Sequence, residues 1–171
     1  MPERLSENAK GVYIISATPF DDDGSIDFNS ADSLVEFYIE KGVNGITILG
    51  MMGEANKMSG DESDGFMRHM LKRVAGRVPV IVGISDPGLN NLVRLAKSSM
   101  DSGAAGVMIA PISGLNTEEK IYNYFEQLFA ALGGDIPVCY QDYPQATGVH
   151  ISVDCFNRQV RDFDQMVMFK H

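Results

Sequence analysis

The stretch GVNGITILG, residues 42–50, decides the fold of this 171-residue chain. A glycine that can end a helix is followed by a short turn, and then by a run of apolar residues without a regular polar alternation. The stretch GAAGVMIAP, residues 103–111, repeats this pattern further along the chain. Apolar runs of this kind are typical of parallel strands that are covered on both faces. The repeat therefore predicts successive units of helix, turn and parallel strand.

Similar apolar runs occur at regular intervals, and together they predict six strands. The expected strands are residues 12–19 (VYIISATP), 45–50 (GITILG), 79–85 (PVIVGIS), 106–111 (GVMIAP), 137–144 (PVCYQDYP) and 165–170 (QMVMFK).

Five helices are expected between these strands, and four of them have clear patterns, at residues 30–42, 59–76, 90–103 and 116–134. Ser59 and Glu62 have the spacing of a capping box at the start of the second helix. Asn116 or Thr117 is the expected N-cap of the fourth helix, and Gly133 is expected to end it.

Alternating strands and helices indicate either a doubly wound sheet or a (β/α)8 TIM barrel. A doubly wound nucleotide-binding fold would have a glycine-rich loop after its first strand, whereas this chain has ATPFDDDGS, residues 17–25. This difference favours the barrel. Since eight units need about 250 residues, we expect a truncated or partial chain: residues 1–171 would be a single incomplete (β/α)8 barrel domain with roughly the first six strands.

The composition limits the partners of the protein. The formal net charge is −9, and basic residues do not form a run, which argues against nucleic acids and anionic membranes as partners. Residues 1–10 are polar, and apolar runs stay far below the ~20 residues of a membrane span, so a cytoplasmic protein is expected. The two cysteines and three histidines have no metal-like spacing, and we expect no metal and no cofactor. Cys139 and Cys155 are interpreted as small core residues.

Functional residues of a barrel lie at the carboxyl ends of its strands, and Lys170 ends the sixth expected strand. An apolar setting disfavours an ammonium and leaves a lysine amine free to attack a ketone and form a Schiff base. The protonated imine then withdraws electrons from a neighbouring bond. On composition alone, however, a lysine at a strand end is more often an exposed side chain.

Two further strand ends carry candidate residues. The turn GMMGE, residues 50–54, can direct successive backbone N–H groups at a carboxylate, although an ordinary turn is also compatible with it. The segment YQDYP, residues 140–144, supplies Tyr140 and Tyr143, either of which can relay protons or simply pack as an aromatic.

Together, the ordered motifs ATPFDDDGSID, GVNGITILGMMGEANKMSGDE, RVPVIVGIS, SGAAGVMIAP, YPQATGV and a strand that ends in lysine resemble the dihydrodipicolinate synthase / N-acetylneuraminate lyase superfamily of class I Schiff-base aldolases. The resemblance extends from Gly11 to Lys170. It implies a barrel, a homo-oligomer (a tetramer or a dimer) and a 2-keto acid such as pyruvate bound to Lys170. It also implies a carboxylate-binding turn formed by Gly50, Met51, Met52, Gly53 and Glu54, and a proton-relaying tyrosine in a Tyr-x-x-Pro motif.

The chain departs from the family pattern at three points. Met51 and Met52 replace the threonine or serine residues that are usual in the turn, and the position three residues before Pro144 is Gln141 rather than tyrosine. Ile112 and Ser113 follow the fourth expected strand, where the synthase has an aromatic pair. Tyr140 is one residue away from that position and would point to the opposite face of the strand unless a bulge shifts it. Tyr143 is the other candidate.

These departures suggest that Schiff-base chemistry persists while the second substrate has changed. Retro-aldol cleavage or dehydration of a 2-keto acid therefore fits better than the lysine-biosynthetic synthase activity, and a carbon–carbon or carbon–oxygen lyase is expected. There are two alternatives: a non-catalytic relative that binds a keto acid, and an inactive barrel fragment.

Overall fold

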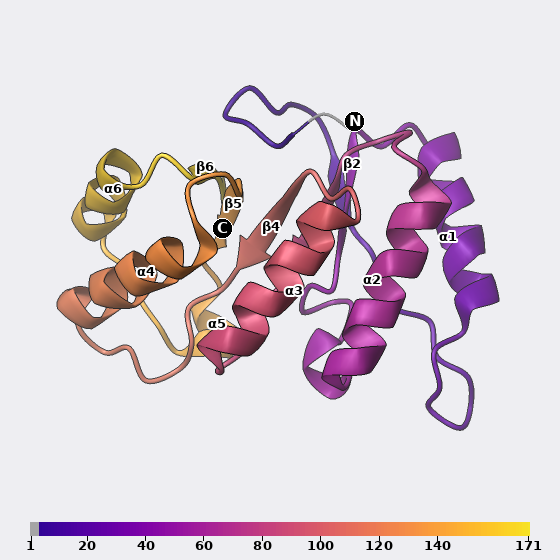
Figure 1. Ribbon diagram of the computed structural model, residues 1–171, viewed down its shortest axis with the longest axis horizontal. Helices are drawn as coiled ribbons and strands as arrows, with labels where there is room; N and C mark the ends of the chain where they lie inside the picture. The colour runs from indigo at the N-terminus through magenta and orange to yellow at the C-terminus, as the bar shows by residue number, and fades with distance from the viewer. Residues whose placement is uncertain (1–3) are drawn as a thin grey trace.

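The computed structural model describes residues 4–171, so the first three residues of the polar amino-terminal stretch lie outside the described part. Strands and helices alternate along the chain (Figure 1). In chain order they are β1 (Tyr13–Ile15), α1 (Phe28–Glu40), β2 (Gly45–Ile48), the 3-10 turn η1 (Ala55–Lys57), α2 (Gly60–Val74), β3 (Val80–Gly83), α3 (Leu89–Asp101), β4 (Gly106–Ile109), α4 (Glu118–Leu132), β5 (Val138–Gln141), α5 (Pro144–Thr147), α6 (Val153–Asp162) and β6 (Met166–Lys170).

The six strands form one parallel sheet in which each strand pairs with its neighbour in sequence, in the order β1 to β6. Helices α1 to α4 lie side by side over one face of this sheet (Figure 1). A parallel sheet in sequential order with the helices outside is the arrangement of a (β/α) barrel. The prediction of a partial barrel with six strands is confirmed.

Two apolar clusters cover the two faces of the sheet. The larger one packs the outer face against the helices and includes Ile46, Val82 and Phe125. The smaller one lies on the inner face, where Leu5 joins Met108. Because the backbone N–H of Leu5 donates to the carbonyl of Ala105, just before β4, the amino-terminal segment covers the amino-terminal end of the inner face (2.9 Å). The opposite end, where the strands finish, is left for the functional site.

The helix signals in the sequence are confirmed. Ser59 and Glu62 form both hydrogen bonds of the capping box at the start of α2. Thr117, rather than Asn116, is the N-cap of α4 and accepts a hydrogen bond from the N–H of Lys120. Gly133 ends that helix with a φ of +83°, which glycine adopts without a steric penalty.

The connection from β5 to β6 contains two helices, although only one was expected there. Pro144 begins the short helix α5, since its ring holds φ near the helical value and its missing N–H is not needed in the first turn. Gly148 ends α5 in the left-handed conformation, and α6 then starts at the N-cap Ser152.

The pairing of β5 with β6 contains a bulge. Val138 pairs with Met166, but Cys139 pairs with Met168, so Val167 is an extra residue in β6. Val167 and Met168 therefore both pack against the inner cluster, instead of on opposite faces. Beyond the bulge, the ring of Phe169 lies on the outer face, 4.4 Å from the Phe156 ring between centroids.

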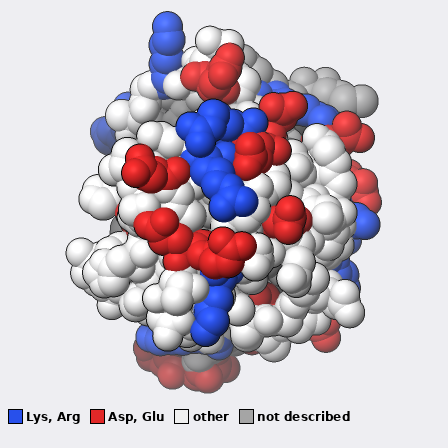
Figure 2. All heavy atoms as spheres, turned by 90° about the vertical axis from the view of Figure 1, so that its left-hand side faces the viewer, with Lys and Arg blue, Asp and Glu red and all other residues white. Residues whose placement is uncertain are grey.

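The surface on the side of α4 and α6 carries a central group of basic side chains that is flanked by acidic ones (Figure 2). Among residues 4–171, none of the helices combines the length and the apolar character that crossing a membrane requires.

Candidate functional site

Lys170 lies at the wall of a cavity at the carboxyl ends of the strands. This cavity, here called the lysine cavity, has a volume of about 490 Å³ and is lined by Ile15, Met51, Met52, Met108, Gln141, Tyr143 and Lys170. Most of its wall is apolar, and the ammonium of Lys170 makes no hydrogen bond or ion pair with another described residue. The structure thus brings together the lysine, the β2 turn and one of the two candidate tyrosines.

The turn after β2 owes its shape to one left-handed residue and one close backbone approach. Leu49 adopts a φ of +53°, a left-handed conformation that is uncommon for a residue with a side chain. Its carbonyl oxygen lies so close to Gly83 of β3 that a Cβ added there would be 2.1 Å from it. Only glycine fits at position 83, and its absence of a side chain allows the chain to turn sharply toward the inner face.

The same turn is held by the segment that follows β1. The hydroxyl of Thr18 is buried and donates to the carbonyl of Gly53 over 2.7 Å. The N–H of Glu54 closes the turn on the carbonyl of Met51, whereas the N–H groups of Met51 and Met52 have no partner among the described residues. Gly50, Met51 and Met52 line cavities, and Gly53 serves instead as the anchor of the turn.

Glu54 lies outside the cavities. Its carboxylate pairs with Lys57 in the adjoining 3-10 turn, where both side chains are largely exposed. Glu54 therefore lies at the rim of the turn and does not line the lysine cavity. Its substrate-binding role stays a prediction.

The two candidate tyrosines occupy different faces of β5 and its end. Tyr140 is fully buried on the outer face, where its ring centroid is 4.7 Å from that of Phe125, and burial raises its pKa above the usual value. Because alternate side chains of a strand point to opposite faces, Tyr140 points away from Lys170. Tyr143, the N-cap of α5, is 41% exposed and lines the lysine cavity. The geometry brings Tyr143, and not Tyr140, to the lysine.

A second cavity adjoins the first. It is here called the glutamine cavity, has a volume of about 470 Å³ and is lined by Leu49, Gly50, Met51, Ala55, Asn56, Gly83, Ser85, Met108, Gln141, Tyr143 and Ala146. Met51, Met108, Gln141 and Tyr143 belong to both cavities. Sequence reasoning did not select Met108 or Gln141 as site residues. The signal for Gln141 was its place three residues before Pro144, where the family motif has a tyrosine.

Cys139 lies below Gln141 on the inner face of β5. Burial raises the pKa of its thiol to about 12, and the nearby charge of Lys170 opposes that shift. Both cysteines are free and buried, as expected for small core residues. Cys139 therefore presents a neutral thiol beneath the site at ordinary pH.

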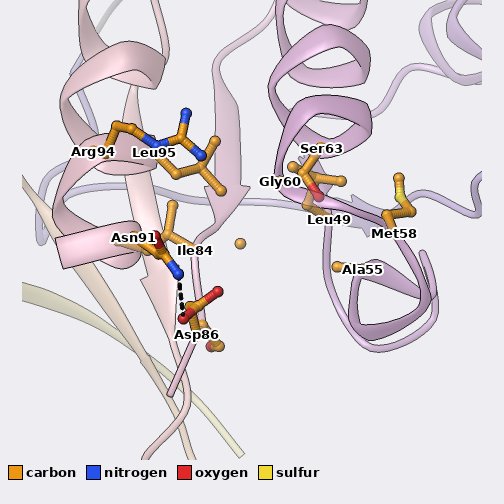
Figure 3. A pocket seen from close by; sticks show the side chains of 12 residues that line it. Leu49, Ala55, Met58, Gly60, Ser63, Ile84, Asp86, Asn91, Arg94 and Leu95 are labelled. Atoms are coloured by element: carbon orange, nitrogen blue, oxygen red, sulfur yellow. Dashed lines mark hydrogen bonds between the residues drawn. The ribbon is translucent and has the colours of Figure 1, made fainter. Parts of the chain in front are cut away.

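A third cavity of about 310 Å³ lies between the amino-terminal parts of α2 and α3 (Figure 3). Its polar side chains include Arg94 and Asp86, and Asn91 donates to Asp86 over 3.4 Å. It touches the glutamine cavity through Leu49, Ala55, Gly83 and Ser85, but Lys170 is not part of its wall.

The fold and the site together define a class: a parallel (β/α) barrel chain with a lysine at the end of its sixth strand, beside a glycine-containing turn after the second. Comparison with known proteins identifies the family. Residues 8–171 match the Dihydrodipicolinate synthetase family, and the chain belongs to this family. The resemblance seen in the sequence is thereby confirmed, and the family is one of lyases.

Three relatives illustrate the similarity. The chain is 28% identical over 167 residues to a 4-hydroxy-tetrahydrodipicolinate synthase of Phocaeicola vulgatus, which covers 97% of this chain and 56% of the relative. A dihydrodipicolinate synthase structure from Rhodopseudomonas palustris is 44% identical with a TM-score of 0.95, covering 99% of this chain and 56% of that one. A prophage protein of the family from E. coli K12, solved in complex with pyruvate, is 25% identical with a TM-score of 0.85, covering 92% and 53%. The chain thus spans little more than half the length of these relatives.

Proposed function

We propose that this protein forms a Schiff base between Lys170 and pyruvate or a related 2-keto acid, and acts as a lyase or aldolase on that adduct. The observation that carries the proposal is the lysine cavity, where an amine without a protein partner stands at an apolar wall beside the turn of residues 50–53. Membership of the family and the pyruvate bound to the E. coli K12 relative support a keto acid as the ligand.

Each residue of the site has a separate role in the proposed reaction. Nζ of Lys170 attacks the ketone carbon, and water leaves as the imine forms. The substrate carboxylate is placed at the turn, where the N–H groups of Met51 and Met52 have no protein acceptor. Tyr143 is the candidate proton relay, because it is the tyrosine that shares the cavity with Lys170. No cofactor is needed for this chemistry, since the protonated imine is itself the electron-withdrawing group.

Trapping tests the proposal directly. Incubation of the purified protein with pyruvate and sodium borohydride should reduce the imine to a stable secondary amine on Lys170, which peptide mass mapping would locate. If the adduct is absent, or lies on other lysines in proportion to their exposure, the proposal fails.

A second function has its own supporting observation. The side chains of Met51 and Met52, which line the lysine cavity, offer no hydroxyl for proton transfer, and an amide such as that of Gln141 does not relay protons. A relative that binds a keto acid without turnover would fit these features. Thermal stabilisation by pyruvate together with an absence of product from a panel of 2-keto acids would favour this alternative.

Assembly as a homo-oligomer, a dimer or a tetramer, stays a prediction. In the described sheet β1 and β6 each have only one neighbouring strand, and Phe169 on β6 is 43% exposed. Strand edges of this kind promote association. Sedimentation equilibrium would decide, and a monodisperse monomer would contradict the prediction.

A further inference from the structure

Asp142, the residue that follows β5, makes two contacts at the end of β6. Its backbone N–H donates to the carbonyl of Lys170 over 2.8 Å, which extends the pairing of the two strands by one residue. Its side chain is only 12% exposed, and Oδ2 of the carboxylate lies 3.0 Å from Nδ1 of His171. One residue therefore holds both Lys170 and the residue next to it.

The direction of the Lys170 side chain depends on its backbone. The ammonium makes no hydrogen bond or ion pair with another described residue. A strand side chain without a polar partner takes its direction from the backbone that carries it and from the residues packed around it. Since β6 pairs only with β5 among the described strands, contacts from β5 and from Asp142 fix that backbone.

His171 is also held by an aromatic contact. Its ring stacks on that of Phe169, with the centroids 6.0 Å apart and an interplanar angle of 21°. Phe169 in turn contacts Phe156 of α6 on the outer face of the sheet. Because side chains alternate along a strand, the residue between Phe169 and His171 points to the inner face. Fixing these two rings on the outer face therefore directs Lys170 into the lysine cavity.

The chemistry of the Asp142 carboxylate defines its contact with His171. An ionised carboxylate only accepts hydrogen bonds, so Nδ1 of His171 carries the hydrogen that is shared between them. Burying a carboxylate is costly unless it has a partner. Within residues 4–171, His171 is the partner of the Asp142 side chain.

We infer that Asp142 and His171 form a clamp that positions Lys170 for attack on the keto acid. Neither residue lines the lysine cavity or the glutamine cavity, so both are positioning residues that act through Lys170. This inference rests on the proposed function and names what holds its nucleophile in place. A reacting amine must approach the carbonyl carbon to roughly 3–3.5 Å, so a small displacement of Lys170 slows formation of the imine.

Replacement of the carboxylate tests the clamp. Asp142→Ala is expected to lower the rate of adduct formation on Lys170 by about fivefold, which corresponds to a hydrogen bond of ~1 kcal/mol. The rate is measured by incubation with pyruvate, timed quenching with sodium borohydride and intact mass measurement. Asp142→Asn keeps an oxygen that accepts from Nδ1–H, and its rate should stay within about twofold of the parent. An alanine variant as fast as the parent, or an asparagine variant as slow as the alanine variant, would overturn the inference.

A double-mutant cycle tests whether the two residues act through one contact. His171→Ala should slow adduct formation as much as Asp142→Ala, and the double variant should be no slower than either, because residues that share one interaction are not additive. Independent effects that multiply in the double variant would overturn the clamp.

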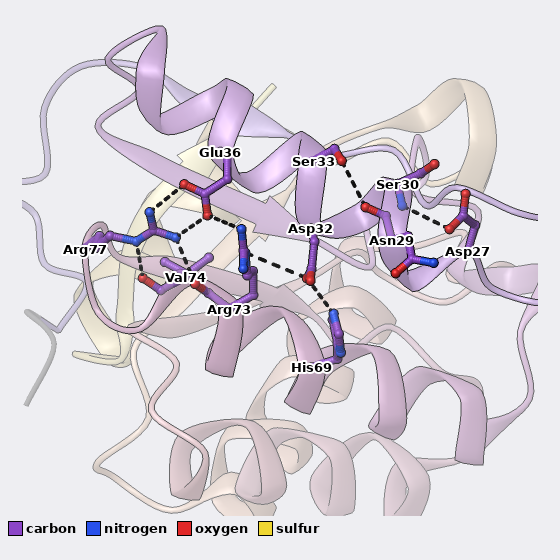
Figure 4. A network of polar contacts seen from close by, with 10 residues as sticks. All are labelled: Asp27, Asn29, Ser30, Asp32, Ser33, Glu36, His69, Arg73, Val74 and Arg77. Carbon is purple, nitrogen blue, oxygen red and sulfur yellow. Dashed lines mark hydrogen bonds and ion pairs between the residues drawn. The ribbon is translucent and has the colours of Figure 1, made fainter.

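The chain supplies a matched control pair. Nε2 of His69 on α2 lies 2.7 Å from Oδ1 of Asp32 on α1, away from the site (Figure 4). His69→Ala should lower the free energy of unfolding and leave the rate of adduct formation unchanged. A decrease in rate as large as that of His171→Ala would show that general destabilisation explains the effect, and would overturn the inference.

Amide hydrogen exchange tests the clamp without pyruvate. In His171→Ala, the N–H of Asp142 should exchange about threefold faster than in the parent or more, as measured by NMR, since its acceptor on Lys170 is held less firmly. Unchanged exchange would overturn the inference even where the parent forms the adduct, and the proposed function would stand. If the parent forms no adduct, the proposed function fails, and the inference that the clamp serves attack on a keto acid fails with it.

Discussion

Gln141 and Lys170 are register partners at the carboxyl ends of β5 and β6, and both side chains line the lysine cavity. The bulge at Val167 produces this pairing, because without the extra residue Gln141 would face Phe169. One irregularity in the sheet thus decides that a lysine, and not a phenylalanine, stands beside the glutamine.

Lys170→Arg should abolish the pyruvate adduct. Arginine keeps the positive charge and much of the length of the side chain, but its guanidinium stays protonated and does not form the imine. Borohydride trapping followed by intact mass measurement checks this. Lys72→Arg, on the exposed side of α2, is the control and should retain the adduct. Persistent labelling in the Lys170 variant would contradict the proposed nucleophile.

Tyr143→Phe and Tyr140→Phe should have opposite consequences. Removal of the Tyr143 hydroxyl is expected to lower kcat by about 10²-fold or more, the usual contribution of a general acid–base group. Removal of the Tyr140 hydroxyl, which is buried without a partner, should leave turnover intact and stabilise the fold by up to about 1 kcal/mol. Steady-state kinetics and urea unfolding measure the two effects. A loss of activity confined to the Tyr140 variant would reverse the assignment.

Gly83→Ala should destabilise the protein by about 1–3 kcal/mol, since the added Cβ would meet the carbonyl oxygen of Leu49 and force the turn to shift. Gly65→Ala is the matched control, because the Cβ would enter open space in the exposed middle of α2. That variant should gain about 0.5–1 kcal/mol in free energy of unfolding. Similar values for both variants would show that the approach of Leu49 is not strained.

The ion-pair network between α1 and α2 should make stability depend on acid pH (Figure 4). Hydrogen bonds from Arg77, together with the charges of Arg77 and Arg73, lower the pKa of Glu36 to about 2 from 4.5. Because the pKa of Glu36 is lower in the folded state than in the unfolded chain, its ionised form stabilises the protein at every pH above the unfolded-state pKa. This contribution disappears as the pH falls toward about 2.

Glu36→Gln measures this contribution. The variant should be less stable than the parent near pH 6, and the difference should vanish at about pH 2 in urea unfolding. Glu40→Gln, on the same helix, matches the change in net charge without the contact to Arg77. A difference that is constant over the whole pH range would exclude the mechanism.

The thiol of Cys139 should resist alkylation in the native protein. Since burial raises its pKa to about 12, only a minute fraction is thiolate at pH 8, and the thiolate is the reactive form. Iodoacetamide labelling followed by mass spectrometry should modify Cys139 only in denaturant. Rapid modification of the native protein would indicate that the inner face of β5 opens.

Local patterns in the sequence predicted the regular parts of the fold. The capping box of Ser59 and Glu62 and the terminating Gly133 were recognisable because they depend on neighbours within a few residues. The candidate site was predicted in part: Lys170, the turn after β2 and Tyr143 do meet at one cavity. Met108 escaped notice, since an apolar residue in an apolar strand gives no local sign of which face it occupies.

The sequence by itself determined six strands, the first four helices between them and the lysine that ends the last strand, because each depends on spacing along the chain. Only the tertiary structure decided which side chains face Lys170. Side chains alternate along a strand, so a single bulge between Val138 and Cys139 reverses the orientation of every following residue of β6. The position of that bulge is set by packing of β6 against β5, which spacing along one segment does not encode.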